Sequence, residues 1–481
     1  MSVARGNLES LDLARSFSDV VPGGRAVFSP SSPSTMVVIN SSRVTVLVIP
    51  SMEVVQVHSC VDKVDDLIFS PDGEYLLCGI YSRNTVQIFS IADSEWKCRI
   101  NEGVASIVGA AWAPDSRNVV TVSDFGVQIS IWSLTDNKCR IIPNPKHNIT
   151  QNFMFDNSGS HLCVVHRTNS VDKIGIYEIN NNWEEVAMLK SVSNDISSVI
   201  WSADDQHIIV VDSPMKYRLV VYQARNGTPV AEFCAYDDAL GIKNVIRQNI
   251  ISRSPVLAVG SYDNRIRLLS ERTWNCVFTL PLSRSSTDTT PNTGEDFKML
   301  VEQPNIQKEG MDTIIVFTEM DLISSRTGNR PYGFSVSNRK EEEEASMKNS
   351  MIHYEDAMWI GWSAENSLLA CYSKVNPQHL WVWNAADGRL STIIVALERI
   401  TCAQWKPVEN SGRAHPNERC SLLAFCTNTA RVYFYDPSSR TITTESLPHG
   451  NSFGIKSLNF NSDSTSLLLQ GNESLVTLTG V

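Results

Sequence analysis

The stretch that decides the fold reads FSPDGEYLLCGI from Phe69 to Ile80 and continues as VQIFS from Val86 to Ser90. It predicts a strand, a tight turn, a second strand, a polar turn and a third strand. In the tight turn, Pro71 presets its own φ, Asp72 can hydrogen-bond the turn backbone, and Gly73 accepts a positive φ.

The same pattern returns eight more times, each copy marked by an aromatic or aliphatic residue that closes its first strand. These residues are Phe28, Trp112, Phe155, Trp201, Ile246, Trp362, Trp405 and Phe460. Most copies follow each other at intervals of about 41 to 46 residues, a period typical of WD40 blades. We therefore predict an all-β fold, a WD40-type β-propeller that forms a single ring of about nine four-stranded blades.

The N-terminal residues supply a device for closing this ring. In WD40 rings the outer strand of each blade comes from the next repeat, so a strand ahead of the first repeat would complete the last blade. Residues 17–21 have the composition of such a strand, and we place the propeller at 17–481 behind a flexible N-terminus at 1–16. The Gly-His dipeptide usual in WD40 blades is absent, so we expect apolar packing to hold the blades.

Regularity fails at 281–356, where we expect a long, largely disordered insertion within the propeller. Residues 283–295 are rich in Ser and Thr, and four consecutive Glu follow Arg339 and Lys340. Such segments bury too little apolar surface to fold alone, although 314–317 is a plausible extra strand. The insertion connects blades six and seven on the face where most WD40 propellers bind partners.

Composition excludes several classes of partner. The net charge is −11 and no tract is dense in Lys or Arg, which argues against nucleic acid. No run approaches the ~18 apolar residues of a membrane span. The eleven Cys are scattered singly, which is typical of a reducing compartment such as the cytoplasm.

No motif in the sequence indicates catalysis, a cofactor or a metal. The nearest approach to a metal cluster is His161, Cys163 and His166, but on a strand His166 points away from the other two. Asp263 lies at a turn where WD40 blades keep an Asp that bonds turn amides, which favours a structural role over a nucleophile. We therefore predict that the protein is not an enzyme.

Particular strings resemble the WD-repeat protein eight family, whose protein is also named for a gene antisense to that of tumour protein p73. They are VQIFS at 86–90, EWKCRINEG at 95–103, AY at 235–236, LGIK at 240–243, LAVGSYD at 257–263 and WVW at 381–383. The resemblance implies a non-catalytic scaffold at the centrosome, spindle pole and basal body, in the cytoplasm and cytoskeleton. It also implies roles in anchoring microtubule minus ends, in spindle assembly and in cilium formation. The partners it implies are a coiled-coil anchoring protein and, in fungi, a minus-end-directed kinesin.

From these strings we predict partner-binding residues Glu95, Trp96, Tyr236, Lys243 and Tyr262, because aromatic anchors ringed by charge are common hot spots. The alternative is that Trp96 and Tyr236 pack between blades. For the whole chain, the alternatives are a translation-initiation-factor-like propeller or another WD40 adaptor, and an enzyme with a central-channel site. The first would be expected to carry basic tracts, and the last would need clustered His, Asp or Glu on inner strands.

Overall fold

The structure is a computed structural model of the whole chain. It describes residues 15–481 except for 104, 137, 147–152, 194, 236–240, 249–254, 283–292, 304–316, 320–357, 408–420 and 448–452. Tyr236 and the four consecutive Glu therefore lie outside the described residues, as does most of the predicted N-terminal segment.

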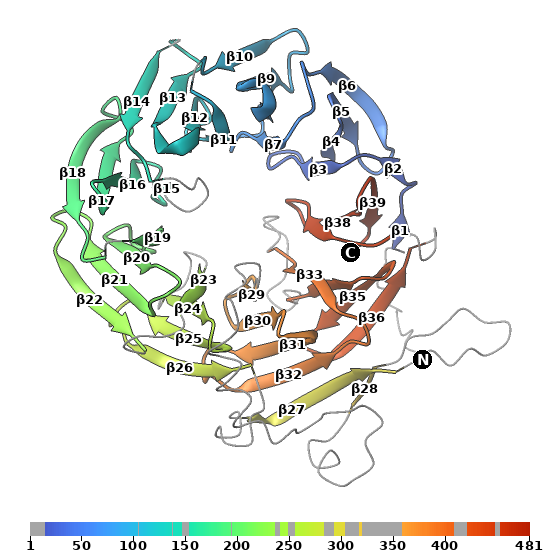
Figure 1. Cartoon of the computed structure of the whole chain (residues 1–481). Helices are drawn as coiled ribbons and strands as arrows, with labels where there is room; N and C mark the ends of the chain where they lie inside the picture. The colour runs from blue at the N-terminus through green and yellow to red at the C-terminus, as the bar shows by residue number, and fades with distance from the viewer. Residues whose placement is uncertain are drawn as a thin grey trace, which may run out of the picture.

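The described residues form nine antiparallel sheets that follow each other around a ring (Figure 1). This confirms the predicted all-β propeller and its nine blades. The remaining regular structure described is two short 3₁₀ turns, η1 (Tyr81–Arg83) and η2 (Asp124–Gly126).

The first five blades each contain four consecutive strands, ordered from the ring's centre to its rim. Blade 1 has β3 (Arg25–Phe28), β4 (Thr35–Asn40), β5 (Arg43–Val48) and β6 (Glu53–Ser59), and blade 2 has β7 (Asp66–Phe69), β8 (Tyr75–Ile80), β9 (Thr85–Ser90) and β10 (Lys97–Asn101). Blade 3 has β11 (Ile107–Trp112), β12 (Asn118–Ser123), β13 (Gln128–Ser133) and β14 (Cys139–Pro143), and blade 4 has β15 (Phe153–Phe155), β16 (His161–Thr168), β17 (Val171–Glu178) and β18 (Glu184–Lys190). Blade 5 has β19 (Ile196–Trp201), β20 (His207–Asp212), β21 (Arg218–Gln223) and β22 (Pro229–Cys234).

The last four blades continue this order with additions at two of them. Blade 6 has β23 (Ile242–Arg247), β24 (Val256–Ser261), β25 (Arg265–Ser270) and β26 (Cys276–Pro281), and blade 7 has β29 (Met358–Trp362), β30 (Leu368–Ser373), β31 (Asn376–Asn384) and β32 (Leu390–Val395), extended by β27 (Thr293–Glu302) and β28 (Phe317–Glu319). Blade 8 has β33 (Ile400–Trp405), β34 (Leu423–Thr427), β35 (Arg431–Asp436) and β36 (Thr441–Ser446), and blade 9 has β37 (Ser457–Phe460), β38 (Ser466–Gln470) and β39 (Ser474–Thr479), joined by β1 (Ser16–Phe17) and β2 (Val21–Pro22).

The Ser-Pro-Asp-Gly turn has the geometry expected from its residues. The hydroxyl of Ser70 donates to Asp72 Oδ1 at 2.5 Å, and the Glu74 amide donates to the same oxygen at 3.0 Å. Gly73 has a φ of +75°. In the next blade Ser116 takes a φ of +58° at the same position, so the turn persists without glycine.

The N-terminal strand closes the ring as predicted, but in two pieces. In β1, Phe17 pairs with Leu478, and in β2, Val21 pairs with Leu475, both on β39 of the last blade. The Ser18 amide between the two pieces donates to the Thr477 carbonyl at 2.8 Å. Blade 9 therefore has no open outer edge along these pairs.

The core is divided among the junctions between blades. The buried residues of the described chain form nine hydrophobic clusters, and each one joins two neighbouring blades. One of them packs Ala26 and Met36 of blade 1 against Leu468 and Leu475 of blade 9, so the ring is closed by packing as well as by pairing. Each blade buries its faces against its neighbours, as repeat architectures require.

A recurring hydrogen bond adds to this apolar packing. At four junctions, the tryptophan that ends the first strand of a blade donates its indole N–H to a first-strand carbonyl of the preceding blade. The pairs are Trp112 to Ile68 (3.1 Å), Trp201 to Met154 (3.1 Å), Trp362 to Ile246 (3.3 Å) and Trp405 to Gly361 (2.9 Å). These indole bonds join blades that lack the usual Gly-His dipeptide.

The insertion contains more regular structure than the sequence predicted, so the expectation for 281–356 needs one correction. Strand β27 pairs in parallel with β32 on the rim of blade 7, and β28 pairs with β27, near the extra strand expected at 314–317. Met299 to Glu302 are buried, and the Glu302 carboxylate accepts hydrogen bonds from the Leu397 amide (2.8 Å) and the Tyr433 hydroxyl (3.0 Å). These contacts are long-range in sequence, so local composition did not reveal them.

Candidate partner-binding surface

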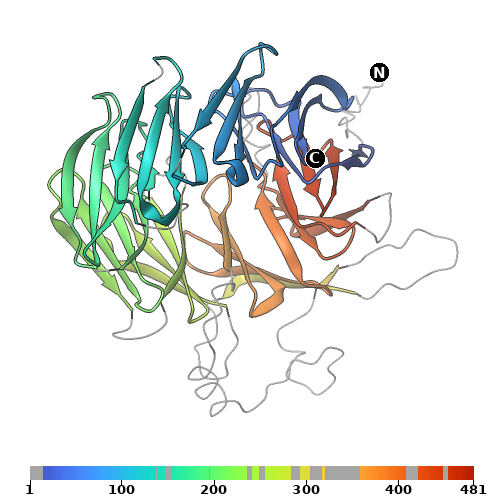
Figure 2. The same ribbon diagram turned by 45° about the horizontal axis from the view of Figure 1, so that its top comes forward.

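The strand order gives the ring two different faces. Because each blade is antiparallel, its first-to-second and third-to-fourth turns lie on one face, which we call the turn face. The second-to-third turns and the connections to the next blade lie on the other, which we call the connection face. Figure 2 shows the strands of each blade running side by side between the two faces.

Two of the five predicted partner residues come together on the connection face of blade 6. The Lys243 ammonium lies 4.5 Å from the centre of the Tyr262 ring, in a cation–π arrangement. The Tyr262 amide donates to the Gly241 carbonyl at 3.2 Å, which holds the turn against the connection from blade 5. Both side chains are half-buried, so each keeps an accessible side.

The other described pair lies elsewhere on the ring. Glu95 and Trp96 form the turn between β9 and β10, on the turn face of blade 2. Glu95 is exposed, whereas Trp96 is half-buried with its ring 5.0 Å from that of Tyr75. Glu95 and Trp96 therefore lie apart from Lys243, and partner binding by these residues stays a prediction. The two pairs lie on opposite faces because they come from turns of opposite type. Trp96 therefore packs inside the propeller, as the alternative interpretation of this residue predicted. Tyr236 lies outside the described residues.

Next to Lys243 and Tyr262, the connection face of blades 4 and 5 is built on an ionic network. The Lys146 ammonium contacts Asp172 Oδ2 at 2.8 Å and Asp195 Oδ1 at 2.7 Å. Asp172 is fully buried and also accepts from the Ile196 amide at 2.7 Å. Arg167 contacts Asp195 at 3.1 Å. The network ties two connections and the second-to-third turn of blade 4 together, so the surface above it has a rigid base.

The electrostatics of this base favour ionised carboxylates. Partial burial opposes ionisation of Asp195, but hydrogen bonds and charge from Lys146 and Arg167 outweigh it, so its pKa lies below the ordinary value. Asp195 is therefore already engaged by two cations, and it does not neutralise the remaining cations of this face.

Hydrogen bonds also connect this surface to blade 5 and to blade 6. The Ser193 hydroxyl donates to Asp212 Oδ1 at 2.6 Å, which also accepts from the Ser213 amide at 2.8 Å. The next residue, Pro214, accepts from the Gly241 amide at 2.9 Å. Adjacent connections and turns are therefore bonded to each other, and the surface is continuous from Val171 to Tyr262.

We define the blade 4–5 surface as Arg167, Val171, Lys173, Lys190, Val192, Met215 and Lys216. Three apolar side chains on it are exposed, with relative accessibilities of 42% for Val171, 52% for Val192 and 61% for Met215. Arg167, Lys190 and Lys216 are exposed cations around them. Apolar side chains ringed by positive charge can bind a partner that presents apolar groups among acids.

Two lysines of this surface oppose each other directly. Lys173 at the start of β17 and Lys190 at the end of β18 are cross-strand partners. Like charges placed opposite each other destabilise a sheet. Sequence reasoning missed this surface because its members come from four separate segments. The exposed Val192 and Met215, each in a polar turn, are the local signal that could have drawn attention to it.

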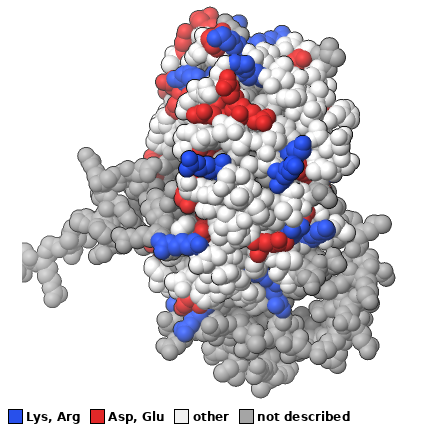
Figure 3. Space-filling view, turned by 90° about the vertical axis from the view of Figure 1, so that its left-hand side faces the viewer, with Lys and Arg blue, Asp and Glu red and all other residues white. Residues whose placement is uncertain are grey.

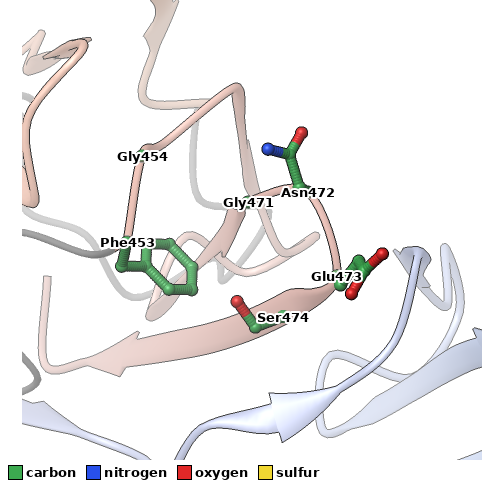
Figure 4. A pocket seen from close by; sticks show the side chains of 6 residues that line it. All are labelled: Phe453, Gly454, Gly471, Asn472, Glu473 and Ser474. Carbon is green, nitrogen blue, oxygen red and sulfur yellow. The ribbon is translucent and has the colours of Figure 1, made fainter.

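A pocket lies on the connection face of blade 9, where the ring closes. It is a shallow pocket of about 570 Å³ lined by Phe453, Gly454, Gly471, Asn472, Glu473 and Ser474 (Figure 4). Glu473 is the titratable side chain in this lining, and its backbone carbonyl accepts from the Gly23 amide at 3.0 Å. Nothing in this lining pairs a nucleophile with a base, so the pocket does not have the arrangement of a hydrolytic site.

The outer rim offers less for recognition. Figure 3 shows the rim on the side of blades 3 to 5, where charged side chains of both signs stand in separate groups on uncharged surface. Several exposed valines on the rim, such as Val186 and Val230, lie where the pairing of an outer strand shifts register. Their exposure follows from these β-bulges.

The polar residues that the sequence singled out have structural partners. Asp263 Oδ1 accepts from the Arg265 amide at 3.1 Å, which confirms the turn-bonding role predicted for it. His161 bonds Asp156 at 3.0 Å, while His166 Nδ1 donates to the Pro143 carbonyl at 3.0 Å.

The described part of the chain meets the requirements of neither a metal site nor a membrane-crossing helix. It contains no group of three or more His, Cys, Asp or Glu side chains placed to hold a metal ion. None of the helical segments in this part has the length and apolar character that a membrane crossing requires.

Comparison with known proteins identifies relatives. No protein-family model matches the chain. It is 24% identical over 399 residues to the WD repeat-containing protein WRAP73 of Mus musculus, covering 82% of this chain and 81% of that protein. It is 20% identical over 337 residues to an uncharacterised WD repeat-containing protein of Schizosaccharomyces pombe, covering 68% and 61%.

Two solved structures match with low TM-scores. The C-terminal WD40 domain of Sif2 matches with a TM-score of 0.48 and 13% identity over 86% of this chain and 96% of that one. The dihydro-heme d1 dehydrogenase NirN matches with a TM-score of 0.48 and 12% identity over 78% and 66%. The sequence similarity to WRAP73, the WD-repeat protein antisense to the p73 gene, spans most of both chains and agrees with the resemblance found in the strings above. The chain is therefore similar to a WD-repeat protein, WRAP73, over most of its length.

Proposed function

We propose that this protein is a non-catalytic scaffold at the centrosome, spindle pole and basal body, in the cytoplasm and cytoskeleton. There it holds protein partners that anchor microtubule minus ends, and it supports spindle assembly and cilium formation. Its partners are a coiled-coil anchoring protein and a minus-end-directed kinesin.

The observation that carries the proposal is the similarity to WRAP73 over 82% of the chain. Because that span covers most of the ring, the relationship concerns the whole propeller rather than one common blade motif. The architecture is consistent with a scaffold, since WD40 propellers generally bind proteins on rigid faces built from turns and connections.

The test is localisation and proximity labelling of the full chain in dividing cells. The expected result is enrichment at spindle poles, with coiled-coil proteins and a minus-end-directed kinesin among the labelled neighbours. Depletion should detach microtubule minus ends from the poles. Labelling dominated by initiation factors and ribosomal proteins, without enrichment at poles, would contradict the proposal and favour a translation-factor-like propeller.

A further inference from the structure

We propose that the blade 4–5 surface binds an acidic amphipathic helix, with its apolar side chains against Val171, Val192 and Met215 and its carboxylates on the surrounding cations. This inference rests on the proposed function, because a coiled-coil partner presents helices. It adds which face binds and what the bound helix must carry.

The first argument is charge. Lys173 and Lys190 oppose each other across β17 and β18. Arg167 is the cross-strand partner of Asp172, the neighbour of Lys173, and its guanidinium is already ion-paired with Asp172 and Asp195. This cationic group occurs on a chain whose net charge is −11. The pairing of two lysines destabilises the sheet, so a carboxylate that bridges them would recover favourable interactions in the complex.

The second argument is exposed apolar surface at the same place. Val171 directly precedes the buried Asp172, and Val192 follows Lys190 by two residues. The Val192 amide donates to the buried Tyr222 hydroxyl at 2.8 Å, which fixes the backbone beneath its exposed side chain. Met215 lies on the adjoining turn and adapts its shape readily to a partner. A polyanion would use the cations and leave these side chains in water.

The third argument is rigidity. Asp172 and Asp195 hold Lys146 at 2.8 Å and 2.7 Å, and the buried bond from Ser193 to Asp212 ties the connection that carries Val192 to blade 5. A surface that is already ordered loses little conformational entropy on binding. The partner helix, rather than the propeller, should therefore order on association.

The test uses purified full-length protein and designed peptides of about 20 residues, long enough to form a helix. One peptide carries leucines along one face and glutamates on its flanks. A second replaces the glutamates with lysines, a third keeps the glutamates and replaces the leucines with serines, and a fourth contains a central proline. We expect the first to bind at least about tenfold more tightly than each of the others, measured by fluorescence anisotropy.

Lys190→Glu is the decisive variant, because it converts the opposed lysines into an opposite-charge pair. We expect it to bind the first peptide about tenfold more weakly while its melting temperature stays level or rises. Met215→Ser should also weaken binding, with little effect on folding, because the side chain is exposed. Lys97→Glu on β10 of blade 2 is the matched control, since it makes the same charge change on another exposed outer-strand lysine.

The proposal is overturned if the serine peptide binds as well as the leucine peptide, since charge alone would then suffice. It is also overturned if Lys190→Glu and Lys97→Glu bind equally well. Localisation separates this inference from the proposed function. If the wild-type protein and Lys190→Glu both reach spindle poles normally, the proposed scaffold function stands and this surface does not bind the partner. If the wild-type protein does not reach the poles, the proposed function fails, and the peptide assay still reports on the surface.

Discussion

Replacing Trp201 by Phe should destabilise the ring through one lost hydrogen bond. The Trp201 indole is buried and donates to the Met154 carbonyl of the preceding blade at 3.1 Å. Phenylalanine keeps most of the apolar contact but cannot donate, so the carbonyl loses this partner at a junction packed with aliphatic side chains.

A second buried tryptophan serves as the matched control. The Trp383 indole N–H lies beside the Cys371 sulfur, a weak acceptor, and makes no hydrogen bond within the described residues. Trp383→Phe removes the same ring atoms without removing such a bond. The net worth of a hydrogen bond is about 1 kcal/mol, and an orphaned buried acceptor costs about 1–3 kcal/mol. The difference between the two variants should therefore be roughly 1–3 kcal/mol.

The assay is urea unfolding followed by circular dichroism, because the loss of a tryptophan would distort fluorescence. Trp201→Phe should unfold at a lower urea concentration than Trp383→Phe, and Trp112→Phe and Trp405→Phe should behave like Trp201→Phe. If all three were no less stable than Trp383→Phe, the indole bonds would contribute nothing, and packing alone would hold the blades.

Three further changes test other parts of the structure. Glu302→Ala leaves the Tyr433 hydroxyl and an amide without their acceptor and should lower the free energy of unfolding by about 2–4 kcal/mol, with faster proteolysis around β27. Burial lowers the pKa of His166, so the unfolded chain binds more protons than the folded one below the ordinary histidine pKa. Stability should therefore fall as pH drops through and below about 6.5, and His166→Gln should flatten this dependence in urea midpoints measured at several pH values. In Gly241→Ala, the new Cβ would clash with the Pro214 carbonyl oxygen, so the connection must shift, and we expect the free energy of unfolding to fall by about 1–3 kcal/mol in thermal unfolding.

The repeat pattern was sufficient to predict the ring because each copy contains the residues that determine its own local structure. The turn at residues 69–73 contains its own Ser, Asp and positive-φ residue, so it can form from local hydrogen bonds alone. The closure by residues 17–21 followed from topology alone. Strand β27 could not be predicted this way, because its parallel pairing with β32 and the anchoring of Glu302 depend on residues about 90 to 130 positions away.

The candidate site was only partly predictable for a related reason. The family-like strings located Lys243 and Tyr262, which do meet, but they also selected Glu95 and Trp96 from the opposite face. A short sequence string does not show which face of the ring its turn occupies. That requires the position of the turn in the strand order of the blade. Had the third-to-fourth turn been separated from the second-to-third turn, the two pairs would have been predicted as different surfaces.

The placement of Lys173 opposite Lys190 is the feature that could least be predicted from the sequence. Near the turn face Tyr177 pairs with Glu185, and a strand continued in that register would place Leu189 opposite Lys173. A bulge at Val186 shifts the pairing by one residue and brings Lys190 there instead. The outer strands of blades 1, 5, 6 and 7 show the same shift, so the bulge belongs to the fold, whereas the two lysines belong to blade 4. A repeated structural irregularity thus creates a charge arrangement specific to one blade, and a reversal of charge at Lys190 tests that arrangement while leaving the bulge intact.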